Sequence, residues 1–114
     1  MDDCIFCKIA SGAIPSKKVY EDDQLIAFHD IAPQAPVHVL VVPKKHISGV
    51  NELAAEDAAL IGQVYSVIQQ LVRELKIDES GYRVVVNSGK DGSQSVPHLH
   101  FHVLGGRSLA WPPG

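Results

Sequence analysis

The segment 98–104 reads His98-Leu99-His100-Phe101-His102-Val103-Leu104 and alternates an imidazole with an apolar residue. A period of two is typical of a β-strand, whose successive side chains point to opposite faces. We therefore predict a strand over residues 97–104, with the apolar residues in a core and the imidazoles on the other face. Neighbouring imidazoles would lie roughly 6.7 Å apart, so the two ends of the row cannot act on one atom, and a division of labour is expected.

Other periodicities predict the rest of an α+β domain. Apolar residues recur at spacings of three and four from Leu60 to Leu75, which predicts a long amphipathic helix over 55–76. Short β-branched or alternating segments predict four further strands, and a short helix precedes them. Together these segments give a five-stranded antiparallel sheet with one long helix and a short N-terminal helix. The four strands are expected over 19–21, 25–29, 37–42 and 82–87, and the short helix over 5–11.

Composition limits the function. The 114 residues are 46% hydrophobic and contain no repeat or linker, so residues 1–114 are expected to form a single domain. The formal net charge of -3 argues against binding of long nucleic acid, which requires a basic surface. The sequence opens Met1-Asp2-Asp3, with no signal-like or membrane-spanning stretch. We therefore expect a cytoplasmic protein that binds no membrane and keeps its cysteines reduced.

Cys4 and Cys7 form a CxxC pair that has two interpretations. A redox function would need a βαβ unit after the pair, but Gly12 breaks the regular structure soon after it. The alternative is half of a tetrahedral zinc site, which needs two further ligands. His46, beyond the third strand, and His98, at the entrance of the fifth, are the best candidates by position. Otherwise they are ordinary surface histidines.

Several polar residues near the histidine row are candidates for a ligand pocket. The Gly- and Ser-rich stretch 87–95 either forms a plain hairpin loop or binds phosphate through backbone N–H groups and the Ser95 hydroxyl. His38 reaches the row if the third and fifth strands are neighbours; otherwise it is a buried structural histidine. His29 and Asp30 end the second strand, where a carboxylate accepts ribose hydroxyls or starts a turn.

The pattern at 98–104, three alternating histidines followed by two more hydrophobic residues, meets every position of the histidine triad signature. On this motif the chain resembles the histidine triad family, in particular its nucleotide-binding branch. The similarity extends over almost the whole length and includes the segments 4–9, 28–36, 41–47, 87–95 and 105–114. It implies a homodimer in which two five-stranded sheets join edge to edge, with the long helices at the interface.

The resemblance also implies a purine nucleotide pocket. Asp30 would bind the ribose, Ile31 would lie beside the base, and the C-terminal tail with Trp111 would reach toward the partner's active site and influence the choice of leaving group. Eukaryotic relatives often carry Gly where this chain has Ser93, so a side chain there narrows the loop. The residues implied around the α-phosphate are Asn87, Ser93, Gln94 and Ser95.

Bacterial-type relatives resemble this chain in pairing two N-terminal cysteines with histidines at the positions of His46 and His98. The comparison therefore supports a structural zinc at Cys4, Cys7, His46 and His98. Relatives that lack the cysteines still function, so the metal is not expected to take part in the chemistry.

The row suits nucleophilic chemistry at phosphorus. A neutral imidazole can attack phosphorus and form a nucleotidyl-histidine, which divides one difficult displacement into two easier steps. His100, in the middle, is the predicted nucleophile, and the resemblance implies that the carbonyl of His98 orients its ring. His102 and Ser95 would donate hydrogen bonds to phosphate oxygens or to the leaving group, and His38 would support the row.

The predicted function is a purine nucleoside phosphoramidase, which hydrolyses the P–N bond of AMP or GMP phosphoramidates. A diadenosine polyphosphate hydrolase or nucleotidyl transferase would use the same histidine with a different leaving group. A non-catalytic nucleotide sensor or protein-interaction module is an alternative of another class. A zinc hydrolase with His98, His100 and His102 as ligands is a further alternative, but it leaves the CxxC pair without partners.

Overall fold

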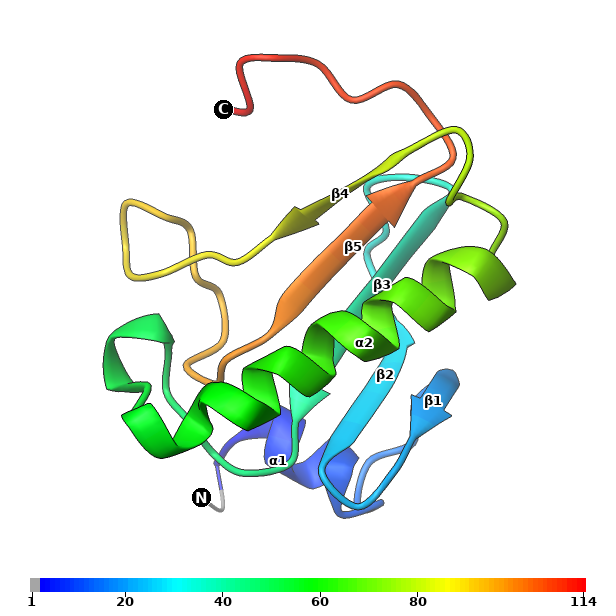
Figure 1. The fold of residues 1–114 in the computed structure, drawn as a ribbon. Helices are drawn as coiled ribbons and strands as arrows, with labels where there is room; N and C mark the ends of the chain where they lie inside the picture. Colours follow the sequence, from blue (N-terminus) through cyan, green and yellow to red (C-terminus); the bar gives the residue numbers. More distant parts are fainter. Residues whose placement is uncertain (1–2) are drawn as a thin grey trace.

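The fold was analysed in a computed structural model that describes residues 3–114; Met1 and Asp2, on which the expectation of a non-basic start partly rests, lie outside them. One antiparallel sheet of five strands has the order β1-β2-β3-β5-β4 (Figure 1). The strands are β1 (Lys18–Glu21), β2 (Leu25–His29), β3 (Val37–Pro43), β4 (Tyr82–Val85) and β5 (Phe101–Gly105). The helices are α1 (Ile5–Ala10) and α2 (Ala58–Glu74), with short 3-10 turns at Val50–Glu52 and Ala55–Asp57. The α+β prediction is confirmed.

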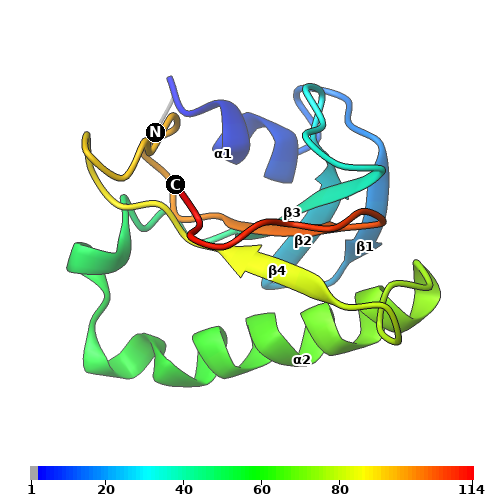
Figure 2. The same ribbon diagram turned by 90° about the horizontal axis from the view of Figure 1, so that it is seen from above.

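The two faces of the sheet are covered differently. Figure 2 shows α2 along one face and α1 on the other. The α2 side holds the larger core, to which Leu99, Phe101 and Val103 contribute as the alternation predicts. The smaller core under α1 joins Phe6 to Phe28 and three residues of β2 and β3. The histidines therefore lie on the less covered side, where the sheet remains open to a ligand.

The register of β3 against β5 brings His38 to the histidine row. Leu40 pairs with His102 and His38 pairs with Leu104, so these side chains share the α1 face of the sheet. The third and fifth strands are neighbours, so the condition under which His38 was expected to reach the row is met.

Several predicted boundaries are wrong. α2 begins at Ala58, after the 3-10 turn Ala55–Asp57, and β4 ends at Val85 rather than at residue 87. β5 begins at Phe101, so His98 and His100 precede the regular strand; the Leu99 N–H donates to the Ile47 carbonyl, 2.6 Å away, outside the strand ladder. The long helix ends at Glu74 because Lys76 adopts a left-handed conformation with φ of 61°, and the Ile77 N–H donates to the Val72 carbonyl. Among residues 3–114, no helix is long and apolar enough to cross a membrane.

Candidate functional site

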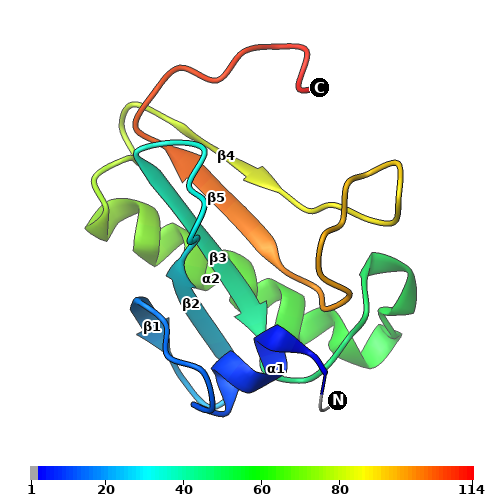
Figure 3. The same cartoon turned by 180° about the vertical axis from the view of Figure 1, so that it is seen from behind.

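A pocket of about 1060 Å³ lies on the α1 face of the sheet. Figure 3 shows α1 in front of β2 and β3, and the loop 30–36 stands on the same side of the sheet in Figure 2. Its apolar walls come largely from α1 and β2, through residues such as Phe6, Ile9 and Phe28. Polar groups come from β3, β5 and the segment before β5 (His38, His102, His100 and Ser95), and also from Lys17, His29 and Asp30. An apolar cavity with a few convergent polar groups is the usual form of a small-molecule site.

A first cluster of histidine and cysteine lies at the N-terminal end of α1. The donor atoms of Cys4, Cys7, His46 and His98 all lie within 4.8 Å of one another. The His98 Nδ1 atom is 3.1 Å from the Cys4 sulfur and 3.1 Å from the His46 Nδ1 atom. The Cys7 sulfur is 3.3 Å from the His46 Nδ1 atom. The structure thus brings together the four residues that the sequence analysis assigned to zinc.

This donor set suits a metal ion. The His98 Nε2–H donates to the Pro43 carbonyl at 2.7 Å, which leaves the lone pair on Nδ1, the atom that faces the sulfurs. The separations are close to the edges of a zinc-centred tetrahedron, about 3.3–3.8 Å for ordinary Zn–N and Zn–S bonds. Burial and the neighbouring Cys4 raise the pKa of the Cys7 thiol, and a bound cation would stabilise the two ionised sulfurs. The cluster can therefore hold a metal ion.

His100 presents a free lone pair to the pocket. Its Nδ1 lies 2.7 Å from the His98 carbonyl, which can only accept a hydrogen bond, so in the neutral ring the proton is on Nδ1 and the lone pair is on Nε2. The ring is 4% exposed and packs edge-on against Phe6, with centroids 5.0 Å apart. An oriented, unprotonated Nε2 atom is the form of imidazole that attacks an electrophile.

The neighbouring His102 presents a proton. The Gln34 N–H donates to His38 Nδ1 at 3.0 Å, so the proton of a neutral His38 is on Nε2. That Nε2–H donates to His102 Nδ1 at 2.9 Å, which places the proton of His102 on its own Nε2. Within the described chain this Nε2 atom is buried and has no hydrogen-bond partner. A buried unpaired donor is costly unless a ligand accepts from it.

His102 stays neutral over most of the pH range. Burial, then the neighbouring His100 and His38, lower its pKa to about 4. Burial also lowers the pKa of His38, although the nearby Asp30 carboxylate opposes the shift. The two histidines therefore act as a neutral hydrogen-bonded pair, with no positive charge of their own.

Asp30, His38 and His102 form a second group whose potential ligand atoms lie within 4.8 Å of one another. A cation at His38 Nε2 would require the lone pair there and the proton on Nδ1. The Gln34 N–H already points at Nδ1, so two hydrogens would face each other. The local backbone thus favours a proton between His38 and His102. The three histidines of the row also divide between separate groups, which argues against the zinc hydrolase with all three as ligands.

Of the residues expected around a nucleotide, some line the pocket and others do not. His29, Asp30, Ile31 and Ser95 line the pocket. Ile31 is 98% exposed at its rim, an unusual position for an isoleucine unless a ligand covers it. Asp30 Oδ1 accepts the Ala32 N–H at 2.8 Å, so this residue also starts the turn that the alternative interpretation expected.

The other loop residues do not line this pocket in the described chain. The Gln94 amide NH₂ donates to the carbonyls of Ser48 and Val96, while its Oε1 accepts the Gly89 N–H. Ser93 has a φ of 61°, the left-handed region in which glycine is favoured, and its N–H donates to the Lys90 carbonyl. Asn87 and Ser93 are not among the lining residues, and a phosphate function for these three residues stays a prediction.

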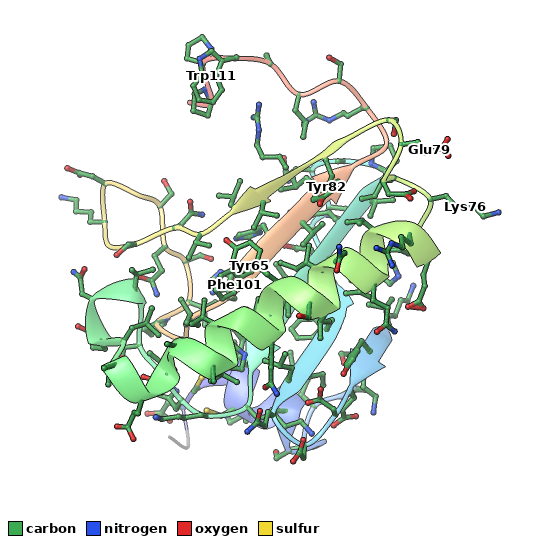
Figure 4. All side chains as sticks on the ribbon, viewed as in Figure 1. Tyr65, Lys76, Glu79, Tyr82, Phe101 and Trp111 are labelled. Atoms are coloured by element: carbon green, nitrogen blue, oxygen red, sulfur yellow. The ribbon has the colours of Figure 1, made fainter. Side chains whose placement is uncertain are left out.

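Trp111 lies far from the pocket of its own chain. It is 81% exposed on a tail that Figure 4 shows extending beyond β4. The Arg83 guanidinium donates to the Ala110 carbonyl at 2.7 Å and so attaches the tail to the edge of the sheet.

Sequence reasoning missed the wall that α1 provides. Ile5, Phe6 and Ile9 line the pocket, and Phe6 contacts both His98 and His100. Their apolar spacing in a helix without another partner was an available signal. The Gln34 N–H and the Pro43 carbonyl are backbone groups, so the type of side chain at these positions does not indicate their function and the sequence could not reveal it.

Comparison with known proteins defines the class. The HIT domain family, named for the histidine triad, matches residues 11–109. An uncharacterised HIT-like protein of Synechococcus elongatus is 51% identical over 113 residues, which cover 99% of this chain and 98% of that protein. The chain belongs to the HIT family.

Two solved structures extend the comparison. A HIT family hydrolase from Legionella pneumophila superposes with a TM-score of 0.97 at 46% identity, covering 98% of this chain and 100% of the other. A histidine triad nucleotide-binding protein from Candida albicans gives 0.83 at 35% identity, covering 96% and 83%.

Proposed function

We propose that the protein is a hydrolase of purine nucleoside phosphoramidates, with His100 as the nucleophile. The observation that carries this proposal is the pairing of two opposite tautomers, an unprotonated His100 Nε2 beside a protonated His102 Nε2. Their ring centroids are 5.0 Å apart in a pocket with apolar walls. A relative described as a HIT family hydrolase and another described as a nucleotide-binding protein support the same assignment.

In the first step, His100 Nε2 attacks the α-phosphorus, the P–N bond breaks, and its electron pair leaves with the amine. The amine takes up a proton from solvent as it leaves, because a neutral His102 can donate a hydrogen bond without giving up its proton. His102 Nε2–H, with Ser95 beside it in the pocket, donates to the phosphoryl oxygens or to the departing nitrogen and stabilises the charge that develops there. The His98 carbonyl keeps the Nδ1 proton of His100 in place while Nε2 becomes bonded to phosphorus.

In the second step, water attacks the nucleotidyl-histidine and the P–Nε2 bond breaks, with its electron pair returning to His100. The proton that the water loses goes to solvent and balances the one that the amine took up, so the nucleotide leaves with His100 neutral again. Asp30 accepts hydrogen bonds from the ribose, and the apolar wall of α1 covers the base. The proposal therefore uses the polar end of the pocket for chemistry and the apolar end for recognition.

We assign a structural zinc to Cys4, Cys7, His46 and His98. The ion would attach the start of α1, through the cysteines, to the segments that carry the two histidines. It would supply no Lewis-acid chemistry to the pocket, because none of its four ligands is among the residues that line the pocket. Both cysteines are free thiols, which suits a reducing compartment such as the cytoplasm.

The test is hydrolysis of an adenosine phosphoramidate beside diadenosine polyphosphates, by the native chain and by His100→Ala, with and without a chelator. Fast phosphoramidate turnover that disappears in the variant and survives the chelator supports the proposal. Preference for the polyphosphates assigns the second enzyme class. AMP binding without turnover leaves the nucleotide sensor.

We also propose a homodimer through β4 and α2. β4 is an edge strand, and beside it the exposed Tyr65 and Tyr82 border a shallow groove that includes Gly62 (Figure 4). Exposed aromatic residues next to an unpaired strand edge are typical of an interface. The tail with Trp111 leaves its own domain beyond the same strand, where it is suited to reach a partner's pocket.

Gly62→Glu tests the dimer without disturbing the protomer. A side chain there meets no atom within 4 Å, so the helix accepts it, but it places a charge in the groove. We expect sedimentation to report a dimer for the native chain and a monomer for the variant. Gln63→Glu, the same charge on an exposed residue outside the groove, is the control. A native monomer would exclude the proposed interface.

A further inference from the structure

Arg107, just beyond β5, forms the outer end of a chain of hydrogen bonds that leads into the pocket. Its Nε and Nη2 atoms both donate to the Gln34 carbonyl, at 3.0 and 2.9 Å. Gln34 in turn supplies the N–H that fixes the tautomer of His38. Arg107 is exposed and touches neither the pocket nor the histidines, so its contacts with the loop are its only route to them.

The loop 30–36 has few other anchors to the end of β5. Gly106 approaches Pro36 so closely that an added Cβ would lie 2.9 Å from the Pro36 Cβ atom. Two of the remaining loop bonds, from the Gln34 amide to the Ala32 carbonyl and from the Ala32 N–H to Asp30, are internal to the loop, and the Asp30 N–H donates to the His38 carbonyl of β3 at 2.9 Å rather than to β5. The Arg107 guanidinium is therefore the main polar attachment of the loop to the strand that carries His102.

The His38–His102 pair has two self-consistent tautomer states. In one, both protons are on Nε2 and His102 presents a donor to the pocket. In the other, both protons are on Nδ1 and His102 presents a lone pair, which repels a phosphoryl oxygen. The Gln34 N–H selects the first state, and Asp30 Oδ2, at 3.4 Å from His38 Nε2, favours it too. Both selecting groups belong to the loop that Arg107 holds.

We propose that Arg107 is a positioning residue that holds the loop 30–36 so that His102 presents its Nε2 proton to the pocket. This inference deepens the proposed function for its effect on turnover. Its effect on the tautomers does not depend on any substrate, so the two can be tested separately.

The test is two-bond ¹H–¹⁵N correlation spectroscopy of histidine-labelled protein without substrate, in which the nitrogen shifts report the tautomer. We expect His38 and His102 of the native chain to carry their protons on Nε2. Arg107→Ala should move both pairs of nitrogen shifts toward the averaged values of a tautomer mixture. Arg107→Lys retains one cationic donor for the Gln34 carbonyl and should restore the native pattern in large part.

Arg83→Ala is the matched control, because Arg83 also donates to backbone carbonyls but holds the tail. It should leave the tautomers unchanged. Turnover should fall about tenfold in Arg107→Ala, mainly in kcat, as is usual when a residue that orients a reacting group is lost. Native shifts in Arg107→Ala would overturn the inference, as would equal changes in Arg107→Ala and Arg83→Ala. If the native chain hydrolyses no phosphoramidate, the proposed function fails, while the spectra still decide the role of Arg107.

Discussion

Two groups of histidines each combine one residue in or just after β3 with one residue of the segment 98–102, and the backbone gives the two groups opposite chemistry. At the Cys4–Cys7 end, the Pro43 carbonyl accepts a hydrogen bond from the Nε2–H of His98, so the lone pair of the ring is on Nδ1 and faces the sulfurs. At the Asp30 end, the Gln34 N–H donates a hydrogen bond to His38 Nδ1, so the proton of His38 is on Nε2 and lies between His38 and His102. The first group can bind a cation and the second can pass or present a proton. The peptide group behind each imidazole, rather than the imidazole itself, makes the difference.

The largest effect should come from removing the nucleophile, which lies between the two groups. His100→Ala should lower kcat by roughly 10⁴-fold or more, as for other covalent nucleophiles. The zinc content should not change, because the His98 ring stays in the metal group. Steady-state kinetics and metal analysis on the same preparation check both statements. An active variant would exclude His100 as nucleophile.

The next largest effect should come from a variant that removes only the metal group. Cys4→Ser combined with Cys7→Ser should abolish zinc binding and lower the stability, by about 4 kcal/mol where free zinc exceeds its Kd a thousandfold. kcat should stay within a few-fold of the native value, because the second group is intact. Thermal unfolding with added zinc or chelator measures the first, and the hydrolysis assay the second. A parallel collapse of kcat would mean that the two groups are not independent.

Acid should distinguish the groups through stability. Burial lowers the pKa of His38 and brings that of His102 to about 4. Both histidines therefore bind protons in the unfolded chain below about pH 6.5, whereas folded His102 does not bind its proton until about pH 4, so the free energy of unfolding falls as the pH is lowered through this window. Urea unfolding of the double serine variant between pH 7.5 and 4.5, which has no metal to release, should show the fall.

His102→Gln in the same background should weaken this pH dependence. A change at Glu52, exposed on a 3-10 turn, offers the control, and Glu52→Gln should leave the slope near its original value. A slope that is unaffected by His102→Gln would show that His102 does not carry the effect.

The smallest effect is expected in the loop that leads into both groups. Ser93 has a φ of 61°, where a side chain costs about 1 kcal/mol. Ser93→Gly should raise stability by up to about that amount, less the backbone entropy that glycine loses. Chemical unfolding measures it, with Ser88→Gly, in the same loop but outside the residues of positive φ, as the comparison. A loss of stability in Ser93→Gly would show that the conformation is not strained.

The sequence predicted what side-chain periodicity encodes. The alternation at 98–104 and the spacing of apolar residues from Leu60 to Leu75 are local, and the layers of the fold follow from them. The adjacency of His38 to the row does not, because it depends on the order of the strands in the sheet. The start of β5 was misplaced because an alternating pattern does not say where its hydrogen-bonded partner begins. His98 lies outside the strand ladder, and its ring forms a hydrogen bond with the Pro43 carbonyl, which is 55 positions away in the chain.

The sequence predicted which residues form the candidate site, but not which nitrogen of each imidazole carries the proton. The four metal-group residues are brought together as expected. In contrast, the proton on each imidazole depends on backbone groups of Gln34, Pro43 and His98, which any residue at those positions would offer. The engagement of the Gln94 side chain with the Ser48 carbonyl likewise depends on a contact between distant segments.

The most direct test of the division between the two groups is to trap the covalent intermediate. The native chain and the Cys4→Ser, Cys7→Ser variant are mixed with an adenosine phosphoramidate, quenched in a denaturant at alkaline pH, and mapped by peptide mass spectrometry. We expect adenylate on His100 in both proteins, formed at similar rates. Adenylate on His98 or His102, or its absence from the variant alone, would contradict the account.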